Sequence, residues 1–461
     1  MRSPSGSLSA LHFTRLHSSF HFLSSAAMTV PPVSMLRRLL HGFAWTMVGS
    51  VVARSGAFVG MFLAARALGK SDFGRLGAIL NTVGLLGVIA GFGLGLTATT
   101  WVSRLRQVDP ARAGRLAGAL LWAGGSAGIV LAIVLAGTAW WFAGTVFEDP
   151  TLTLPLALSS ALVPLNVLFG IQSGVITGCG NFSRLAKVNI VAGIAALPAV
   201  WLGAIWYGLV GAVVGLVLAQ AIVLAWSSRV VGLTMAQAGL RIDGRQWWRE
   251  WHLIVGFSMP TALASVMVIP VNWLSSAWLV RTADFAELGM FNAGNTWRML
   301  IIFIPLQFVT ASLPTLADAR GRGDRRTFNR TCAIALAVSG GVAVAIAGVV
   351  AIGADTMLAL FGDEFAGGSA VLIVLAWSAL PMALNNVMGA AITGAGLPWR
   401  NAAATGVYAL AALGALIFIP ASALGLAWAQ LVACLLATCV YAVLLLGLRF
   451  PTEDSSSVAT A

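Results

Sequence analysis

The 461-residue chain is 59% hydrophobic and 9% charged, whereas soluble domains are roughly 45–50% apolar and 25% charged. This composition excludes a soluble globular protein and indicates a polytopic membrane protein. The formal net charge of +12 would favour a nucleic-acid partner on a soluble surface, but in a membrane protein the charge has to be assigned loop by loop. We therefore expect no nucleic-acid partner.

Residues 1–35 differ from the rest of the chain. They are rich in Ser and His, carry Arg2 and Arg15, and contain no acidic residue. Their apolar run is too short and broken for a secretory signal, and we expect the segment to be disordered. Two interpretations stay open: a transit-like peptide, or the simpler one, an over-extended start with Met28 or Met35 as the true first residue.

From Arg37 onward, apolar segments long enough to cross a membrane core of ~30 Å recur without interruption. They predict an all-α protein with about twelve transmembrane helices. The predicted spans are 40–64, 75–99, 117–143, 152–177, 185–206, 209–228, 252–279, 288–313, 331–353, 366–393, 401–420 and 424–447.

The basic residues indicate which connections between the predicted spans lie on the cytoplasmic side of the membrane. One set of alternate connections carries 21 of the 27 Lys and Arg residues, and the other set carries four. By the positive-inside rule both termini of the predicted multi-pass protein are cytoplasmic. The two basic residues that remain, Arg54 and Arg298, fall within the spans, where there is no Asp or Glu.

The sequence also repeats itself. Residues 71–77 recur as 283–289, an offset of 212, and residues 176–184 recur as 392–400, an offset of 216. Such offsets indicate two six-helix halves. Because each half has an even number of spans, the repeats are expected to be parallel, with the substrate site between them near the membrane midplane. The predicted domains are an N-terminal extension (1–35), a first bundle (36–230), a cytoplasmic linker (231–251), a second bundle (252–448) and a disordered cytoplasmic tail (449–461).

Local explanations account for much of the repeated sequence. Asp72 and Asp284 are expected to act as helix N-caps or as first-turn anions that suit the helix dipole. The glycine pairs 178/180 and 394/396 are expected to end helices. The four cysteines show neither a CxxC pair nor Cys/His metal spacing, so we expect no metal site and no cofactor.

Several motifs in order resemble the polysaccharide-export flippases, the Wzx-type O-antigen and capsule translocases of the multidrug/oligosaccharidyl-lipid/polysaccharide (MOP) superfamily. They are Arg54 in the first span, ALGKSDFGRL at 67–76, GLG at 93–95 leading to Arg104 and Arg106, GMFNA at 289–293 and FIPL at 303–306. The resemblance covers about residues 36 to 448. It implies a V-shaped pair of bundles that alternates between inward-open and outward-open states and moves an undecaprenyl-pyrophosphate-linked oligosaccharide to the periplasmic leaflet. The other partners it implies are membrane lipids and the polymerase and export machinery, and the location it implies is the bacterial inner membrane.

The residues themselves agree with such a substrate, because a buried pyrophosphate needs cations and hydrogen-bonding groups without competing carboxylates. Arg54 offers a planar fork for phosphate oxygens, and Ser50 shares its helix face. Asn292, Asn295 and Arg298 follow a three-residue spacing on one side of a helix. The candidate binding residues are Arg54, Arg298, Ser50, Asn292, Asn295, Asn272 and Asn81.

Alternatives exist for these residues and for the function. Asn272 and Asn81 are also suited to bridging helices, and either arginine can be a static residue bonded to backbone carbonyls or one that snorkels to the surface. A multidrug or cation antiporter of the same superfamily fits the fold, but its usual coupling carboxylate within the spans is missing. A membrane glycan polymerase or ligase is disfavoured because no catalytic constellation is present, so we predict a transporter and no enzyme.

Overall fold

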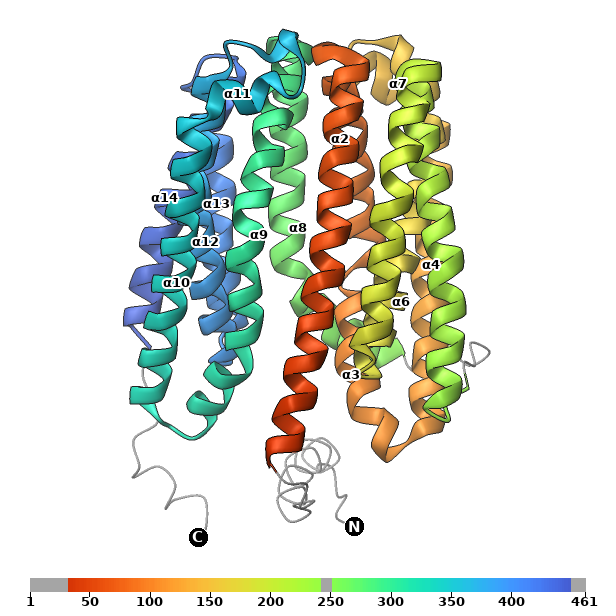
Figure 1. The fold of residues 1–461 in the computed structure, drawn as a ribbon, viewed down its shortest axis with the longest axis vertical. Helices are drawn as coiled ribbons and strands as arrows, with labels where there is room; N and C mark the ends of the chain where they lie inside the picture. Colours follow the sequence, from red (N-terminus) through yellow and green to blue (C-terminus); the bar gives the residue numbers. More distant parts are fainter. Residues whose placement is uncertain (1–31, 242–250, 449–461) are drawn as a thin grey trace, which may run out of the picture.

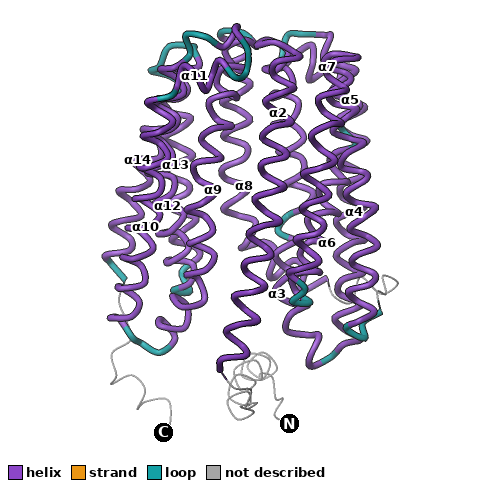
Figure 2. Tube along the Cα trace, in the orientation of Figure 1, coloured by secondary structure: helices purple, strands orange, loops and turns teal. Residues whose placement is uncertain are grey.

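The computed structural model describes residues 32–241 and 251–448, and every regular element in these ranges is a helix (Figures 1 and 2). The helices form two side-by-side halves with nearly parallel axes. The described chain begins and ends at the same end of the bundle, which we name the inner end; the opposite end, where α11 lies, is the outer end.

The first half contains two long helical segments that each reverse direction. α2 turns back at Gly69, whose φ of 78° favours glycine. α7 turns back at Tyr207 and Gly208, where the glycine φ is 57°. The elements of this half are α2 (Pro32–Gly91), α3 (Leu94–Val108), α4 (Pro110–Trp141), η2 (Phe142–Val146), η3 (Pro150–Leu152), α5 (Thr153–Ser159), α6 (Leu162–Gly178) and α7 (Phe182–Gln237).

The second half is built from single helices. A short α11 and a 3₁₀ turn, η5, cover the outer end between two of its long helices. Its elements are α8 (Trp251–Thr282), α9 (Phe285–Gly321), α10 (Arg325–Ile352), α11 (Ala354–Ala359), η5 (Asp363–Phe365), α12 (Ser369–Gly394), α13 (Pro398–Ala415) and α14 (Ala423–Leu446).

The predicted fold class is confirmed. α2 and α7 each cross the bundle twice, because each reverses direction once. α3 continues the second crossing of α2, and α5 and α6 together make one crossing. Counted in this way, the described chain crosses the bundle twelve times. Length and hydropathy alone qualify seven stretches of the described chain as membrane-spanning, and two of these, 49–108 and 182–237, contain the reversals.

Some predicted boundaries differ in the structure. The span predicted at 75–99 is broken at Phe92 and Gly93, which have φ values of 30° and 73°. The span predicted at 152–177 consists of η3, α5 and α6. α7 continues to Gln237, seven residues beyond the predicted end of the first bundle at 230. Residues 1–31, 242–250 and 449–461 lie outside the described residues. They hold most of the predicted extension, part of the predicted linker and the whole predicted tail.

Close packing of small residues joins α2 to α7. A Cβ atom added to Gly56 would meet the backbone carbonyl of Gly193, and one added to Gly49 would lie 2.6 Å from the Cα of Ala186. Gly60 faces Leu197 in the same way. In a membrane such contacts matter because helices associate through van der Waals packing and not through exclusion of water. This packing fixes which face of α2 points away from α7.

The expected helix starts and ends are present at all four places. Gly180 and Gly396 adopt φ values of 74° and 80° after α6 and α12. The Asp284 side chain accepts a hydrogen bond of 2.7 Å from the Glu287 N–H at the start of α9. Asp72 takes the other expected position, in the first turn of the helix that starts after Gly69, and its carboxylate accepts a hydrogen bond of 2.7 Å from Arg75.

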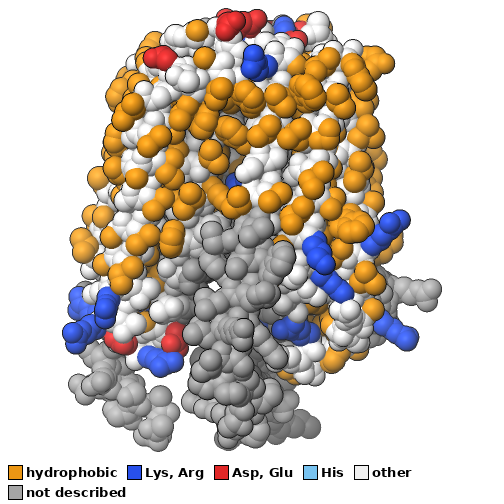
Figure 3. All heavy atoms as spheres, in the orientation of Figure 1, with side chains coloured by type: hydrophobic (Ala, Val, Ile, Leu, Met, Phe, Trp, Pro, Cys, Tyr) orange, Lys and Arg blue, Asp and Glu red, His pale blue; other side chains and the backbone are white. Residues whose placement is uncertain are grey.

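Charge separates the two ends of the bundle. Figure 3 shows a wide apolar band, Lys and Arg side chains gathered at the inner end, and most of the visible Asp and Glu at the outer end. The apolar band is the surface that faces lipid.

Candidate functional site

One stripe of α2 faces the second half of the molecule. Ser50, Arg54, Phe58 and Phe62 follow one another at four-residue spacing, which places them on one helix face. The Phe58 ring lies 4.9 Å from the ring of Trp297 in α9. The predicted first and eighth spans therefore do face each other across the two halves.

Arg54 is an exposed cation on this stripe. Its Cζ atom lies 4.6 Å from the centroid of the Phe303 ring in α9, within the range of a cation–π contact. Among the described residues it forms neither a hydrogen bond nor an ion pair. Arg54 thus holds its charge at the border of the two halves with no anion beside it.

Aromatic rings close the outer side of the same stripe. Phe62 and Phe73 of α2 lie 5.6 Å and 6.1 Å from Phe361, which follows α11. Phe73 also lies 6.1 Å from Phe365 of η5. Because Phe58 and Phe62 lie beyond Arg54 toward the outer end, Arg54 sits on the inner side of this aromatic seal.

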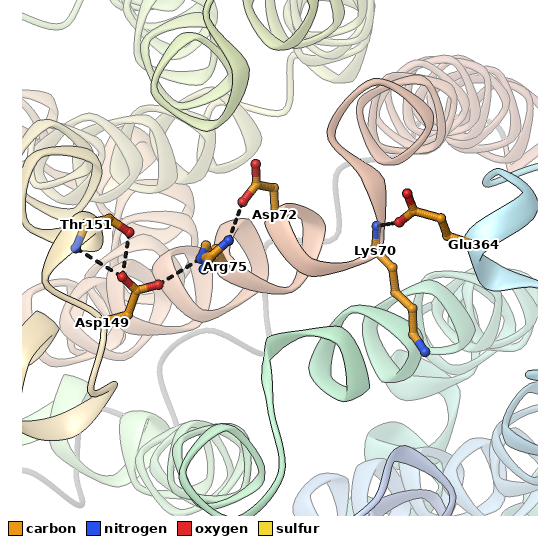
Figure 4. A network of polar contacts seen from close by, with 6 residues as sticks. All are labelled: Lys70, Asp72, Arg75, Asp149, Thr151 and Glu364. Carbon is orange, nitrogen blue, oxygen red and sulfur yellow. Dashed lines mark hydrogen bonds and ion pairs between the residues drawn. The ribbon is translucent and has the colours of Figure 1, made fainter.

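Polar contacts reinforce the closure at the outer end (Figure 4). The Glu364 carboxylate accepts a hydrogen bond of 2.7 Å from the Lys70 backbone N–H, so a side chain of the second half caps the helix that starts after Gly69. Arg281 of α8 pairs with Glu148 of the first half at 3.1 Å. The two halves therefore meet at their outer ends through charges as well as rings.

Arg75 connects two acids within the first half. Its guanidinium binds Asp72 at 2.7 Å and Asp149 at 2.8 Å, and it lies 5.2 Å from the ring of Phe285 in α9. Burial opposes ionisation of Asp149, but hydrogen bonds from Thr151 and Arg75 outweigh it and lower the pKa of this carboxyl below its ordinary value.

Arg298 occupies a different environment from Arg54. It is five residues from Phe303, so it is turned about 140° away around α9, and its side chain points into the second half. Only 5% of Arg298 is exposed. Its Nε donates to Asn295 Oδ1 at 3.0 Å, and its Nη1 donates to Gln430 Oε1 and, at 3.5 Å, to Ser378 Oγ. All of these partners are neutral.

A cavity of about 150 Å³ lies beside Arg298. It adjoins a second one of about 520 Å³ that reaches Thr393 and Asn401, near the turn between α12 and α13. Both cavities lie within the second half. Residues that line both are Val268, Asn385, Asn386, Thr405 and Tyr441.

The other predicted site residues have separate surroundings. Asn272 lines the cavity beside Arg298, and Asn295 holds the Arg298 guanidinium. Asn292 packs against Gly77 of α2, and its buried Nδ2 has no hydrogen-bond partner among the described residues. Asn81 donates to Ser276 of α8 at 2.9 Å, which is the bridging role. Ser50 is partly buried one turn from Arg54.

The structure therefore divides the predicted site into two. Arg54 borders the second half at α9, with Ser50 one turn away on the same helix face. Arg298 and Asn272 line a cavity inside the second half, and Asn295 holds the Arg298 guanidinium. Sequence reasoning did not identify Tyr408, Tyr441 and Asn401. The chain has only 3 tyrosines, and the presence of two of them within the late spans was the available signal.

The chemistry of both places is binding and not catalysis. The described residues contain no cluster of His, Cys, Asp and Glu side chains able to hold a metal ion. What they offer is guanidinium charge, amides, hydroxyls and aromatic rings, which suit phosphate, carboxylate and sugar groups.

Comparison with known proteins identifies the family. The model of a family described as polysaccharide biosynthesis protein matches residues 39–320, more than half of the chain. The chain belongs to this family. The model of the MatE family matches residues 260–411 of this polysaccharide biosynthesis protein, in keeping with the MOP superfamily.

Two relatives carry the name EPS I polysaccharide export inner membrane protein EpsE. The protein from Ralstonia nicotianae is 28% identical over 247 residues, which are 52% of this chain and 54% of the relative. The one from Ralstonia solanacearum is 27% identical over 201 residues, 43% of this chain and 44% of the relative. The chain spans about half the length of the relatives it matches.

Solved structures of the MOP superfamily share the fold. An inward-facing MATE family multidrug resistance transporter superposes with a TM-score of 0.71 at 13% identity, covering 90% of this chain and 99% of that one. An outward-facing MATE transporter gives 0.69 at 15% identity, covering 94% and 100%. At these identities the likeness establishes the fold alone.

Proposed function

We propose that the protein is a flippase that moves an undecaprenyl-pyrophosphate-linked oligosaccharide repeat unit across the bacterial inner membrane by alternating access. In this role it is a transporter and not an enzyme. In the proposed orientation both termini are cytoplasmic, so the inner end of the bundle takes up the substrate and the outer end releases it. A polysaccharide polymerase and the export machinery would receive the product.

The observation that carries this proposal is Arg54. A cation in the middle of a membrane-spanning arm costs at least ~2.5 kcal/mol on insertion scales, and no described acid compensates it. A pyrophosphate supplies the missing charge, and the guanidinium fork matches two of its oxygens. Because Arg54 is exposed beside α9, the pyrophosphate can bind there while the lipid chain stays in the bilayer.

The closed outer end supports the transport direction. Rings from α2 meet Phe361, and Glu364 and Glu148 bind groups of the opposite half. Arg54 lies on the inner side of these contacts. A substrate bound at Arg54 in this conformation would be reached from the inner end, and release outward would require the seal to part.

The test is lipid flipping by the full chain in proteoliposomes, measured with a fluorescent polyprenyl-pyrophosphate oligosaccharide. Arg54→Ala should lower the initial rate about 10- to 100-fold, the loss expected for charge-assisted hydrogen bonds of ~1.5–3 kcal/mol. Arg54→Lys should retain part of the rate because it keeps the charge and loses the fork.

Arg66 provides a matched control, since it is an exposed arginine three turns farther along the same arm. Arg66→Ala should leave the rate within twofold. Equal rates for wild-type protein and Arg54→Ala would contradict the assignment of Arg54. Gradient-driven export of cationic dyes without lipid flipping would favour the antiporter alternative.

A further inference from the structure

The cavity beside Arg298 collects polar groups that have no partner. Within the described residues, the structure records no hydrogen bond for Arg298 Nη2, the Tyr408 hydroxyl, or the side-chain amides of Asn272 and Asn386. All four residues line the same cavity. Polar groups in a membrane interior normally bond to one another, so their common orientation toward an open space indicates a ligand.

The charge of the missing partner follows from the neighbours of Arg298. Asn295, Ser378 and Gln430 orient the guanidinium but do not neutralise it. Neither cavity is lined by an acidic residue. A buried cation without an anion is costly, whereas a ligand carboxylate would accept charge-assisted hydrogen bonds from the free Nη2.

The size and lining of the space indicate more than a single ion. The two adjoining cavities, about 150 Å³ and 520 Å³, together fall in the ~300–1,000 Å³ range of small-molecule sites. Asn386, Asn401, Thr405 and Tyr441 line the larger one, and such amides and hydroxyls suit sugar hydroxyls. Tyr441 already bonds to Thr405 and Asn401, whereas the Asn386 amide bonds to no described residue. A monatomic anion at Arg298 would leave Asn386 unpaired and most of this space unfilled.

The cavity also borders the surface between the halves. It is lined by residues of α8 and α9, the second-half helices that contact α2. Met299, next to Arg298, lines it and is 38% exposed. A pyrophosphate at Arg54 would lie on the Phe303 side of α9, so a ligand that reaches both arginines would contact them with different parts.

We propose that the Arg298 cavity binds a carboxylate-bearing sugar of the hexuronic acid class, and that the glycan this protein transports is therefore acidic. This inference rests on the proposed flippase function and specifies its substrate class. Arg298 binds the carboxylate, Tyr408 and Asn272 bind groups beside it, and Asn386 binds a ring hydroxyl.

The first test measures binding of free sugars to the purified full-length protein by isothermal titration calorimetry. Sodium glucuronate should bind saturably, with glucose at least tenfold weaker and sodium chloride at equal ionic strength not competing. Arg298→Gln should weaken glucuronate binding about 10- to 100-fold, and Arg298→Lys less. Tyr408→Phe removes a hydroxyl that bonds to no described residue, so this variant should fold normally and weaken binding several-fold.

Other results of this test would overturn the inference. Glucuronate binding that is unchanged in folded Arg298→Gln and in Tyr408→Phe would exclude the cavity. Competition by chloride, or equal affinity for glucose and glucuronate, would mean a small-anion site or a neutral sugar site instead.

The second test separates this inference from the proposed function. Proteoliposomes receive two pyrophosphate-linked disaccharide lipids that differ only in whether the terminal sugar is glucose or glucuronic acid. Wild-type protein should flip the acidic lipid at least tenfold faster, and Arg298→Gln should bring the ratio close to one, while Arg54→Ala lowers both rates and keeps the ratio. Flipping of both lipids at one rate would overturn the acidic-glycan inference alone, and flipping of neither would overturn the flippase proposal.

Discussion

Asp149 shows how a single carboxylate stabilises the outer end. Its side chain is 13% exposed and binds Arg75 at 2.8 Å, while Thr151 donates to it from backbone and side chain. The lowered pKa of Asp149 means that the ionised form is favoured more in the folded protein than in the unfolded chain. Its contribution to stability is thus linked to pH.

We expect Asp149→Asn to lower the free energy of unfolding by about 1–2 kcal/mol at pH 7, the scale of a charge-assisted hydrogen bond. The contribution is fully present above the unfolded pKa of ~3.9 and is lost as the pH falls through the lowered folded pKa. Thermal unfolding of both proteins in detergent from pH 7 to pH 3 measures the difference. A stability gap that stays constant down to pH 3 would contradict this linkage.

The sequence was enough to single out the two intramembrane arginines, but not to predict which residues surround each of them. A census of charges singles out Arg54 and Arg298, because they alone remain in the spans once the loops are assigned. Arg54 of α2 contacts one face of α9, and the Arg298 side chain extends from another face of α9. This arrangement depends on how the helices pack, which spacing along the chain does not specify. Tyr408 escaped prediction for the same reason, since a tyrosine in an apolar span looks like a packing residue until Arg298 is placed beside it.

At the scale of the elements, the contact of α2 with α7 orients Arg54. Gly56 faces the Gly193 carbonyl, and Gly49 and Gly60 face Ala186 and Leu197. Any side chain on this face of α2 would push the helices apart. Arg54 would then lose its position against Phe303.

Gly56→Ala should therefore destabilise the protein by about 1–3 kcal/mol, the cost of overpacking, although alanine favours a helix. Gly137→Ala in α4 is the matched control, because a Cβ there meets nothing within 4 Å; this change should be neutral or slightly stabilising. Thermal unfolding and flipping rates measure both effects. Equal stability of the two variants would show that α2 and α7 tolerate a wider separation.

The elements were largely predictable, apart from their interruptions. Glycines at 69, 180 and 396 signal turns because they permit positive φ, and long apolar runs signal spans. The break at Phe92 follows no local rule, because a phenylalanine at positive φ is held by its surroundings. The division of the fourth span into η3, α5 and α6 does have a local signal, because Pro150, Pro155 and Pro164 each lie within the first three residues of one of these elements.

At the scale of the whole molecule, the two copies of the repeated sequence meet at the outer end. Gly74 packs against the backbone of Phe285, and Gly289 packs against the backbone of Lys70. The aromatic seal lies beside them. These contacts leave no room for a side chain at either glycine. A larger residue at Gly74 or Gly289 therefore tests whether the outer end has to close.

Gly289→Leu should hold the outer end open and reduce flipping at least tenfold. In a background without the four native cysteines, Asn292→Cys near Gly77 would be protected from a membrane-impermeant thiol reagent, and adding Gly289→Leu should expose it. Gly341→Leu is the control, since a Cβ there meets nothing within 4 Å. Protection that persists in Gly289→Leu would mean that the outer end closes without this contact.

The meeting of the two copies has a consequence for how the molecule opens. In a twofold dimer, every contact of such an interface occurs twice about the axis. Here both copies belong to one chain, and the contacts of Gly74 with Phe285 and of Gly289 with Lys70 are two different contacts at the offset of 212. Parting the outer ends breaks both of them together, and we expect opening to be a single cooperative event and not a stepwise loosening.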